Sequence, residues 1–355
     1  MRRTAFGVVV SSLVLSLSLV ACGQQQASSN SVSSTEQSVT SAASESSSTS
    51  ATSQAASNAS GATSNPIGTV SNAFAEDKDA LIANYADKFT QETYTDGDTG
   101  LSVTYNLFLP AGYDAAKSYP MVVFIADSSC TGDDATRSLT QGRGALVWAS
   151  DEWQAANPCI VCVPTYPETI LDDHGSYTTT EYVELTKRLI EGVSSSYAVD
   201  TNRIYGTGQS MGCMTTLILA SEYPDLYAGC MFVDGQWDVS VLKGLESQNF
   251  VYFAAEDDEN AFAGMSEVMA MFDTDGVASA SAQWDGTWSP DQLSAAANEL
   301  FAAGQKANFI SWATGTIDAS AGGMGGGMGS ASYHMASFDY AYRCVAVMEW
   351  LFQQQ

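Results

Sequence analysis

The sequence predicts an α/β fold with a mostly parallel central sheet, helices on both faces and an antiparallel hairpin at its N-terminal edge. Short, continuously apolar runs, as expected of parallel strands covered on both faces, alternate with segments of helical periodicity. Ahead of them, residues 88–96 and 101–110 look like two strands, the second clearly alternating, joined by Asp96-Gly97-Asp98-Thr99-Gly100, which is typical of a hairpin. The order of the elements therefore indicates βαβ units preceded by one antiparallel pair.

In the parallel part, predicted helices lie between most of the predicted strands. The strands expected after the hairpin are residues 121–126, 159–164, 204–205, 227–233, 250–255 and 309–313. The expected helices are residues 144–156, 179–197, 211–223, 261–272, 295–303 and 337–352. A helix start is indicated by Ser289-Pro290-Asp291-Gln292, which has a capping serine, proline at the first position and glutamine three residues after the cap. The glycine- and methionine-rich run 320–330 is interpreted either as an adaptable apolar pocket wall or as a flexible insertion.

Two segments precede the domain. Residues 1–22 have a charged start, Arg2-Arg3, and an apolar stretch too short for a stable membrane span. They end in Leu19-Val20-Ala21-Cys22, which resembles a bacterial lipobox and predicts a lipoprotein signal with lipid attachment at Cys22; an ordinary secretory signal is the alternative. Residues 23–65, rich in Ser, Ala and Thr, are predicted to be a disordered tether. The catalytic domain is expected at 66–355, outside the cytoplasm and anchored to the cell membrane.

Charge and composition exclude several classes of partner and cofactor. The net charge of −27 argues against nucleic acid or an anionic lipid surface as a partner, and the scattered acids favour a solubilising surface. Cys159 and Cys162 lie three apart in a predicted strand and should point to opposite faces, so they are a poor metal-ligand pair. A disulfide between Cys130 and Cys159 is one candidate pairing, because each cysteine lies near an end of a predicted strand. Without a P-loop, dinucleotide fingerprint or histidine metal motif, we expect no cofactor and no metal.

The stretch from residue 203 to residue 220 carries the strongest chemical motif. It is predicted to be a buried strand, a tight turn and a helix, with Gly208-Gln209-Ser210-Met211-Gly212 at the corner, which matches G-x-S-x-G. Side chains at Gly208 or Gly212 would collide with the neighbouring backbone where the turn is tightest. The turn would expose the Ser210 hydroxyl and aim the Met211 amide, at a helix N-terminus, toward any negative charge forming beside it.

A serine nucleophile needs a general base, usually histidine, and the chain has only two histidines. His174 precedes Ser210 in a polar loop, whereas His334 lies after the last predicted strand and before the closing helix. In the order Ser, acid, His of the α/β-hydrolase fold, the histidine occupies that late loop, so His334 is the predicted base. We interpret His174 as a surface-loop histidine, with substrate contact as the less favoured alternative.

The acid and the oxyanion donors are expected at two other strand ends. The strand at 250–255 leads into Glu256-Asp257-Asp258, where Asp258 is the preferred acid and Asp257 and Glu256 are alternatives in that order. The Met211 amide would hold the oxyanion together with a second amide, at Asp127 or Ser128, from the loop after the first buried strand. The usual His-Gly start of that loop is replaced by Ala126-Asp127, which leaves the second donor open.

Together these motifs resemble a known group of enzymes. From about residue 94 to 352 the chain is similar to α/β-hydrolase esterases of the predicted-peptidase group, relatives of polyhydroxyalkanoate depolymerases and feruloyl esterases. The matching pieces are residues 105–110, 119–124, 148–150 with Gln154, Pro158-Cys159, 200–212 and 349–352. The resemblance implies that Ser210, Asp258 and His334 hydrolyse a small-molecule or polymer ester through an acyl-enzyme. A serine peptidase of the same fold and a non-catalytic surface lipoprotein that binds carbohydrate or lipid remain alternatives.

Overall fold

The computed structural model describes residues 70–322 and 329–355. The predicted signal and tether lie outside these residues, as do residues 323–328 of the glycine- and methionine-rich run. A search of the described helices finds none that is both long and apolar enough to cross a membrane.

A mixed sheet forms the centre of the described chain. Nine strands pair in the order β1-β2-β4-β3-β7-β8-β9-β11-β10. Their bounds are β1 Thr90–Thr95, β2 Ser102–Phe108, β3 Tyr119–Ile125, β4 Ile160–Thr165, β7 Val199–Gln209, β8 Gly229–Val233, β9 Phe250–Ala255, β10 Ser279–Trp284 and β11 Ala307–Trp312. β2 pairs antiparallel with both β1 and β4, and every later pair in this sheet is parallel. The predicted parallel sheet with an antiparallel N-terminal hairpin is confirmed.

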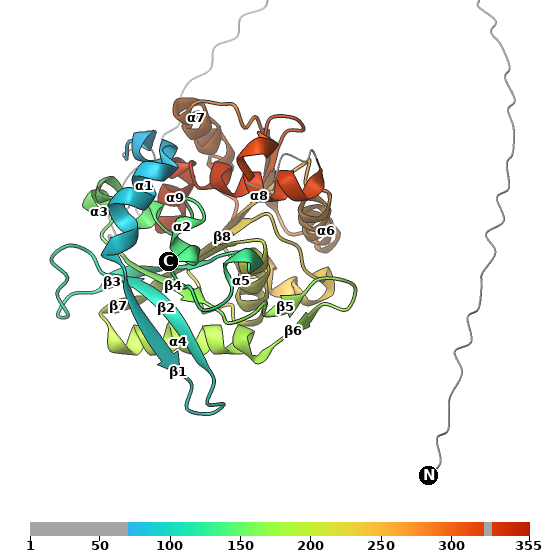
Figure 1. Ribbon diagram of the computed structural model, residues 1–355. Helices are drawn as coiled ribbons and strands as arrows, with labels where there is room; N and C mark the ends of the chain where they lie inside the picture. The colour runs from blue at the N-terminus through green and yellow to red at the C-terminus, as the bar shows by residue number, and fades with distance from the viewer. Residues whose placement is uncertain (1–69, 323–328) are drawn as a thin grey trace, which may run out of the picture. The chain divides into compact units, whose positions relative to one another are not determined.

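Helices cover both faces of the sheet (Figure 1). Their bounds are α1 Lys78–Tyr85, α2 Arg137–Thr140, α3 Asp151–Ala156, α4 Glu181–Ser196, α5 Met211–Glu222, α6 Glu259–Asp275, α7 Pro290–Phe301, α8 Ser330–Ala341 and α9 Val345–Phe352. The core cluster on one face includes residues of α1, α3, α7, α8 and α9, and the cluster on the other face includes residues of α4, α5 and α6. β3 contributes Val122 and Phe124 to the first cluster and Met121 and Val123 to the second, which explains why its sequence is apolar without interruption.

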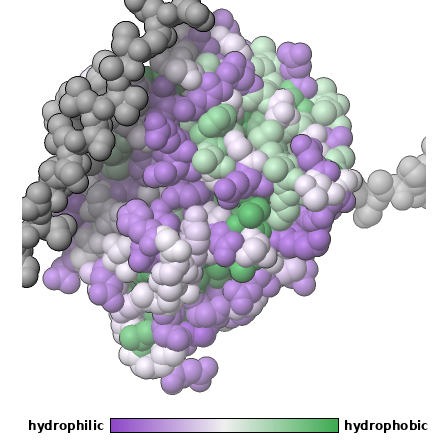
Figure 2. Space-filling model, turned by 90° about the vertical axis from the view of Figure 1, so that its right-hand side faces the viewer, coloured by the Kyte–Doolittle hydropathy of each residue, from purple (hydrophilic) through white to green (hydrophobic). Residues whose placement is uncertain are grey.

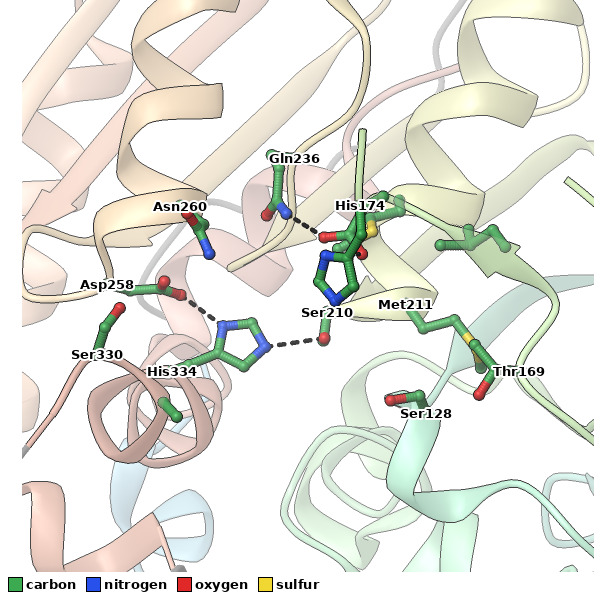
Figure 3. A pocket seen from close by; sticks show the side chains of 14 residues that line it. Ser128, Thr169, His174, Ser210, Met211, Gln236, Asp258, Asn260, Ser330 and His334 are labelled. Carbon is green, nitrogen blue, oxygen red and sulfur yellow. Dashed lines mark hydrogen bonds and ion pairs between the residues drawn. The ribbon is translucent and has the colours of Figure 1, made fainter. Parts of the chain in front are cut away.

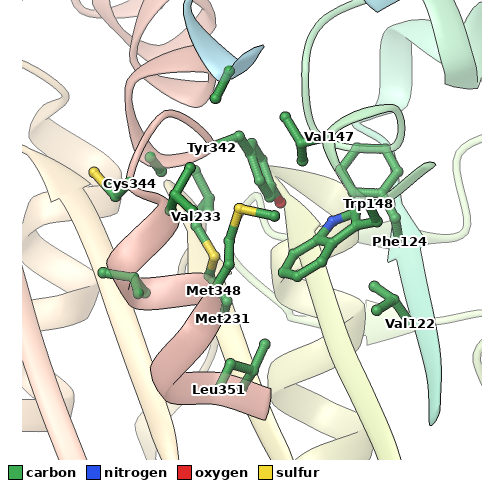
Figure 4. Packing of buried hydrophobic residues seen from close by; sticks show 14 of the residues in the cluster. Val122, Phe124, Val147, Trp148, Met231, Val233, Tyr342, Cys344, Met348 and Leu351 are labelled. Carbon is green, nitrogen blue, oxygen red and sulfur yellow. The ribbon is translucent and has the colours of Figure 1, made fainter. Parts of the chain in front are cut away.

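The C-terminal helix α9 closes the first of these clusters (Figure 4). Trp148 is fully buried and stacks on Phe352 at 5.8 Å between ring centroids. Nearby, the hydroxyl groups of Tyr342 and Thr207 lie 2.9 Å apart, so the buried phenol has a polar partner. Full burial of a large apolar side chain contributes about 1.5–3 kcal/mol, and this cluster therefore fixes α9 against β7 and β8.

Several helix boundaries differ from the sequence predictions. The helix expected at 144–156 is reduced to α3, because Ser150 accepts a hydrogen bond from the Trp153 amide at 3.2 Å and starts the helix there. The closing helix expected at 337–352 is instead two helices, α8 and α9, interrupted by residues 342–344. The predicted Ser289 capping box is confirmed at the start of α7.

Three strands of the structure are not predicted from the sequence. β10 lies at the far edge of the sheet, and its sequence, Ser-Ala-Ser-Ala-Gln-Trp, contains only one large apolar residue because one side of an edge strand stays open. The short pair β5 (Leu171–Asp172) and β6 (Thr178–Thr179) forms a separate two-stranded hairpin. Both strands have two residues, too few to show an alternating pattern.

Of the two predictions about cysteines, one is wrong and one is confirmed. Cys130 and Cys159 are buried and free, so the guessed disulfide between them is wrong. The Cys130 thiol instead donates to Gln141 Oε1 at 3.1 Å, and the Cys159 sulfur lies 3.2 Å from Gln154 Nε2. Cys159 and Cys162 belong to the core clusters on opposite faces of the sheet, as their spacing predicts.

Candidate active site

Ser210 occupies a strained corner between β7 and α5. Its backbone has φ 51° and ψ −118°, a conformation that residues other than glycine rarely adopt. A Cβ atom at Gly208 would lie 2.5 Å from the Gly212 backbone, and one at Gly212 would lie 1.9 Å from the Ile125 carbonyl oxygen. Both distances are far inside van der Waals contact. The corner therefore requires both glycines of the motif, as the sequence predicts.

Ser210, His334 and Asp258 come together in one hydrogen-bonded row (Figure 3). His334 Nε2 lies 2.8 Å from Ser210 Oγ, and His334 Nδ1 lies 2.5 Å from Asp258 Oδ2. The Asp258 side chain is 3% exposed and the His334 side chain 22% exposed, so the row runs from the protein interior to solvent. This is the geometry of an activated serine, in which the histidine contacts the hydroxyl and the carboxylate orients the histidine.

The start of α6 fixes the position of the Asp258 side chain. It is the N-cap of that helix, and its Oδ1 accepts the Ala261 amide at 3.4 Å, while Oδ2 faces His334. The other two candidate acids point elsewhere. Glu256 binds Ser311 and Thr314 through its side chain, and Asp257 accepts the Gly315 amide at 2.7 Å. Of the three, only Asp258 contacts the imidazole.

His334 lies inside α8, not in the loop that the sequence analysis expected. The helix starts at Ser330 and places the imidazole edge-on against Phe338, with ring centroids 4.9 Å apart. Burial lowers the pKa of His334, but the hydrogen bond to Asp258 and the charges of Asp258, Asp234 and Asp127 raise it above its ordinary value. The site is thus arranged to stabilise an imidazolium.

The expected oxyanion donors lie on the other side of Ser210. Met211 is the first residue of α5, and both Met211 and Ser128 line the pocket beside Ser210. Asp127 is 2% exposed, and its carboxylate accepts the Ser129 amide at 2.8 Å and Gln209 Nε2 at 3.2 Å. Its side chain therefore ties the loop after β3 to the serine corner. This contact is not predicted from the sequence, because it involves Gln209, a variable position of G-x-S-x-G.

The row opens into a pocket of about 460 Å³. His174 lines it from the β5–β6 hairpin and is drawn above Ser210 in Figure 3. Its side chain is 87% exposed, as a surface-loop histidine should be, yet its place on the pocket wall keeps the substrate-contact alternative open. Asp173, the residue before His174, accepts a hydrogen bond from Gln236 Nε2. This bond holds the hairpin against the loop after β8.

Other pocket residues escaped the sequence analysis. Gln236 and Asn260 follow the carboxyl ends of β8 and β9, and Thr169 lies between β4 and the hairpin. Ligand-binding residues in open parallel sheets gather at the carboxyl ends of strands, so the positions after 233 and 255 were the available signal. The face drawn in Figure 2 mixes hydrophilic with weakly hydrophobic residues, and strongly hydrophobic residues appear on it only as small patches.

A search of the described residues for converging metal ligands finds one group. The ligand atoms of Asp172, Asp173 and His174 lie within 4.8 Å of one another. Asp172 and His174 are exposed, and Asp173 already accepts a hydrogen bond from Gln236. The group has the character of a solvated hairpin tip.

The sheet order and the strand–serine–helix corner define the α/β-hydrolase fold. The family model described as "Putative esterase" matches residues 97–318, and the chain belongs to this esterase family. The chain is similar to a solved thermostable esterase, with 25% identity and a TM-score of 0.58 over 76% of this chain and 64% of that one.

Two curated proteins match over shorter segments. Poly(3-hydroxyalkanoate) depolymerase C of Paucimonas lemoignei is 33% identical over 49 residues, which cover 14% of this chain and 12% of that protein. Feruloyl esterase B of Talaromyces funiculosus is 33% identical over 67 residues, covering 19% of this chain and 18% of that protein. The chain thus matches less than a fifth of either relative's length.

Proposed function

We propose that the protein is a serine hydrolase that cleaves carboxylic esters through an acyl-enzyme. The observation that carries this proposal is the row Asp258–His334–Ser210, with contacts of 2.5 Å and 2.8 Å, ending in an open pocket. Membership of the esterase family supports the choice of bond.

In the first half-reaction the Ser210 oxygen attacks the acyl carbon while His334 Nε2 takes the hydroxyl proton. The C–O bond to the alcohol then breaks, and His334 returns that proton to the departing alkoxide. Water repeats the sequence on the acyl-enzyme, releasing the carboxylic acid and restoring Ser210. Asp258 holds the tautomer with hydrogen on Nδ1 and stabilises the imidazolium in both halves.

The oxyanion of each tetrahedral intermediate would accept hydrogen bonds from two backbone amides. Met211 supplies one from the N-terminus of α5, where the helix dipole favours negative charge. Between the two earlier candidates for the second donor, we favour Ser128 over Asp127. Ser128 lines the pocket beside Ser210, whereas Asp127 is almost fully buried.

The pocket favours neutral esters, either small molecules or the ends of a polymer. Its wall combines apolar surface from Leu171, Met211 and Met214 with polar groups of the hairpin. The Asp173 carboxylate at the rim and the overall charge of −27 would repel an anionic acyl chain.

A comparison of p-nitrophenyl butyrate with the matching p-nitroanilide and a short peptide series tests the proposal. We expect turnover of the ester and, because the amine is a poorer leaving group, none measurable for the amide and the peptides. Comparable hydrolysis of peptides would favour the peptidase alternative. Failure to turn over any ester or amide, together with binding of a carbohydrate or lipid, would favour the non-catalytic alternative.

We further propose that the enzyme works outside the cytoplasm, attached to the cell membrane through a lipid on Cys22. The lipobox-like Leu19-Val20-Ala21-Cys22 and the polar run that follows it support this. In a bacterial host, the wild-type chain should label with radioactive palmitate and sediment with membranes, and Cys22→Ser should lose both properties. Membrane recovery of an unlabelled Cys22→Ser chain equal to wild type would contradict the proposal.

A further inference from the structure

A second carboxyl group, Asp234, lies close enough to Asp258 and His334 to interact with both electrostatically. It follows β8, is 0% exposed and has φ 42°. Its amide donates to the Phe253 carbonyl at 2.9 Å, and its Oδ1 accepts the Ala255 amide at 2.8 Å. Ala255 in turn accepts the Asp258 amide at 3.0 Å. Asp234 is therefore bound to the end of the strand that delivers the triad acid.

This arrangement is costly for the folded protein. The other carboxyl oxygen, Oδ2, is buried and accepts no well-formed hydrogen bond in the described part of the chain, because the hydroxyl of neighbouring Ser337 donates to the His334 carbonyl at 2.9 Å. Buried Asp96 shows the contrast, because it accepts two hydrogen bonds from Thr99 and contacts Arg188 at 3.0 Å. An unpartnered buried carboxyl and a positive φ are both destabilising, and such features gather at functional sites.

We propose that Asp234 is a positioning residue, a second buried carboxyl group that fixes the end of β9 and supplies negative charge behind the imidazolium of His334. The proposal rests on the function proposed above and adds a member to its machinery. Asp234 does not line the pocket, so it would act on His334 without touching the substrate.

Five titratable groups from three parts of the chain surround Asp234. Asp258 follows β9, His334 lies on α8, Cys213 on α5 and Tyr252 on β9, and Tyr342 directly follows α8. Burial raises the pKa of Cys213, Tyr252 and Tyr342 well above their usual values, so these three stay neutral at pH 8. The local charge then depends on the two aspartates and the histidine.

Burial, followed by the charge of Asp258, raises the pKa of Asp234 to about 7, while the Ala255 amide, His334 and Ser337 oppose the rise. Asp234 is therefore protonated in mild acid and ionised above neutrality. When ionised it raises the pKa of His334, as the charges of Asp258 and Asp127 also do. Its charge is thus available at the pH where a serine hydrolase needs a neutral histidine that becomes an imidazolium during the reaction.

Asp234→Asn separates this role from simple packing. Asparagine tolerates a positive φ and can still accept the Ala255 amide, so the variant keeps the shape and loses the charge. At pH 8 we expect kcat to fall about 5- to 10-fold with KM unchanged, since a nearby buried charge shifts such an equilibrium by roughly one pKa unit. In a plot of kcat/KM against pH, the rise on the acid side (the acid limb) should move to lower pH, because one of the charges that raise the pKa of His334 is gone.

Stability should change in the opposite direction from activity. The pKa of Asp234 is higher in the folded than in the unfolded state, so the folded protein loses stability as pH rises from about 4 through about 7. Asparagine does not ionise, so Asp234→Asn does not lose this stability. Its Tm should exceed that of wild type by several degrees at pH 8 and match it near pH 4. The control Asp96→Asn should lower Tm at pH 8, since hydrogen bonds from Thr99 lower the pKa of Asp96, and should leave the acid limb in place.

A drop of kcat/KM by the same factor at every pH, with a lower Tm at pH 8, would show a purely structural role and overturn the proposal. An unchanged kcat and acid limb would overturn it as well.

Asp234→Gly provides a second variant, because glycine adopts the positive φ without strain. It should show the same shift of the acid limb and a larger loss of kcat. If Ser210→Ala kept its turnover, the proposed mechanism itself would fail; if it lost turnover while Asp234→Asn behaved like wild type, only the role of Asp234 would fail.

Discussion

Ser210→Ala should reduce the turnover of p-nitrophenyl butyrate by about 10⁴- to 10⁶-fold, the range seen when a triad nucleophile is removed. Alanine supplies no nucleophilic oxygen, and the hydroxyl group whose proton His334 would take is lost. The fold should persist, because the corner is set by Gly208 and Gly212 and by the Ser210 amide, which donates to Val233 at 3.1 Å.

Ser330→Ala is a matched control in the same pocket. The Ser330 hydroxyl accepts the Glu259 amide at 3.1 Å and has no place in the proposed proton path, so activity should stay within a few-fold of wild type. If Ser210→Ala turned over the ester at the wild-type rate, another residue would have to be the nucleophile.

The second large effect is expected from Asp258→Asn, which should lower kcat by about 10³- to 10⁴-fold at pH 8. The amide group cannot stabilise the imidazolium, and its NH₂ would favour the tautomer of His334 that cannot take the serine proton. Stability should change less, because asparagine is also a good N-cap for α6.

Asp257→Asn is the neighbouring control, and it also tests the choice among the three acids. Asp257 accepts the Gly315 amide and has no contact with His334, so its replacement should alter kcat no more than a few-fold. A larger loss in Asp257→Asn than in Asp258→Asn would transfer the role of the acid to Asp257.

The parts of the site that the sequence predicted follow from local constraints. The glycines at 208 and 212 are required by close backbone approaches, which makes the corner visible in the sequence. His334 could be chosen because the only other histidine lies before the serine in the chain. The parallel strands were visible because both of their faces are buried, and the predicted hairpin carries strong turn residues.

The remaining features depend on tertiary packing. His334 lies in a helix because α8 begins at Ser330, next to a glycine-rich run that gives no boundary signal. The free cysteines reflect distances between elements that spacing along the chain does not encode. Asp234 could not be singled out among 40 acidic residues, since its significance comes from complete burial beside β9.

In the proposed mechanism, His334 activates Ser210 as the nucleophile. The most direct test is covalent labelling of the folded protein with a fluorophosphonate, with the modified residue located by peptide mass spectrometry. We predict one adduct, on Ser210, that forms rapidly in wild type and at least about 100-fold more slowly in His334→Ala, since general-base help is typically worth 10²- to 10⁴-fold. An adduct on another residue, or equally fast labelling of Ser210 in His334→Ala, would show that His334 does not activate Ser210.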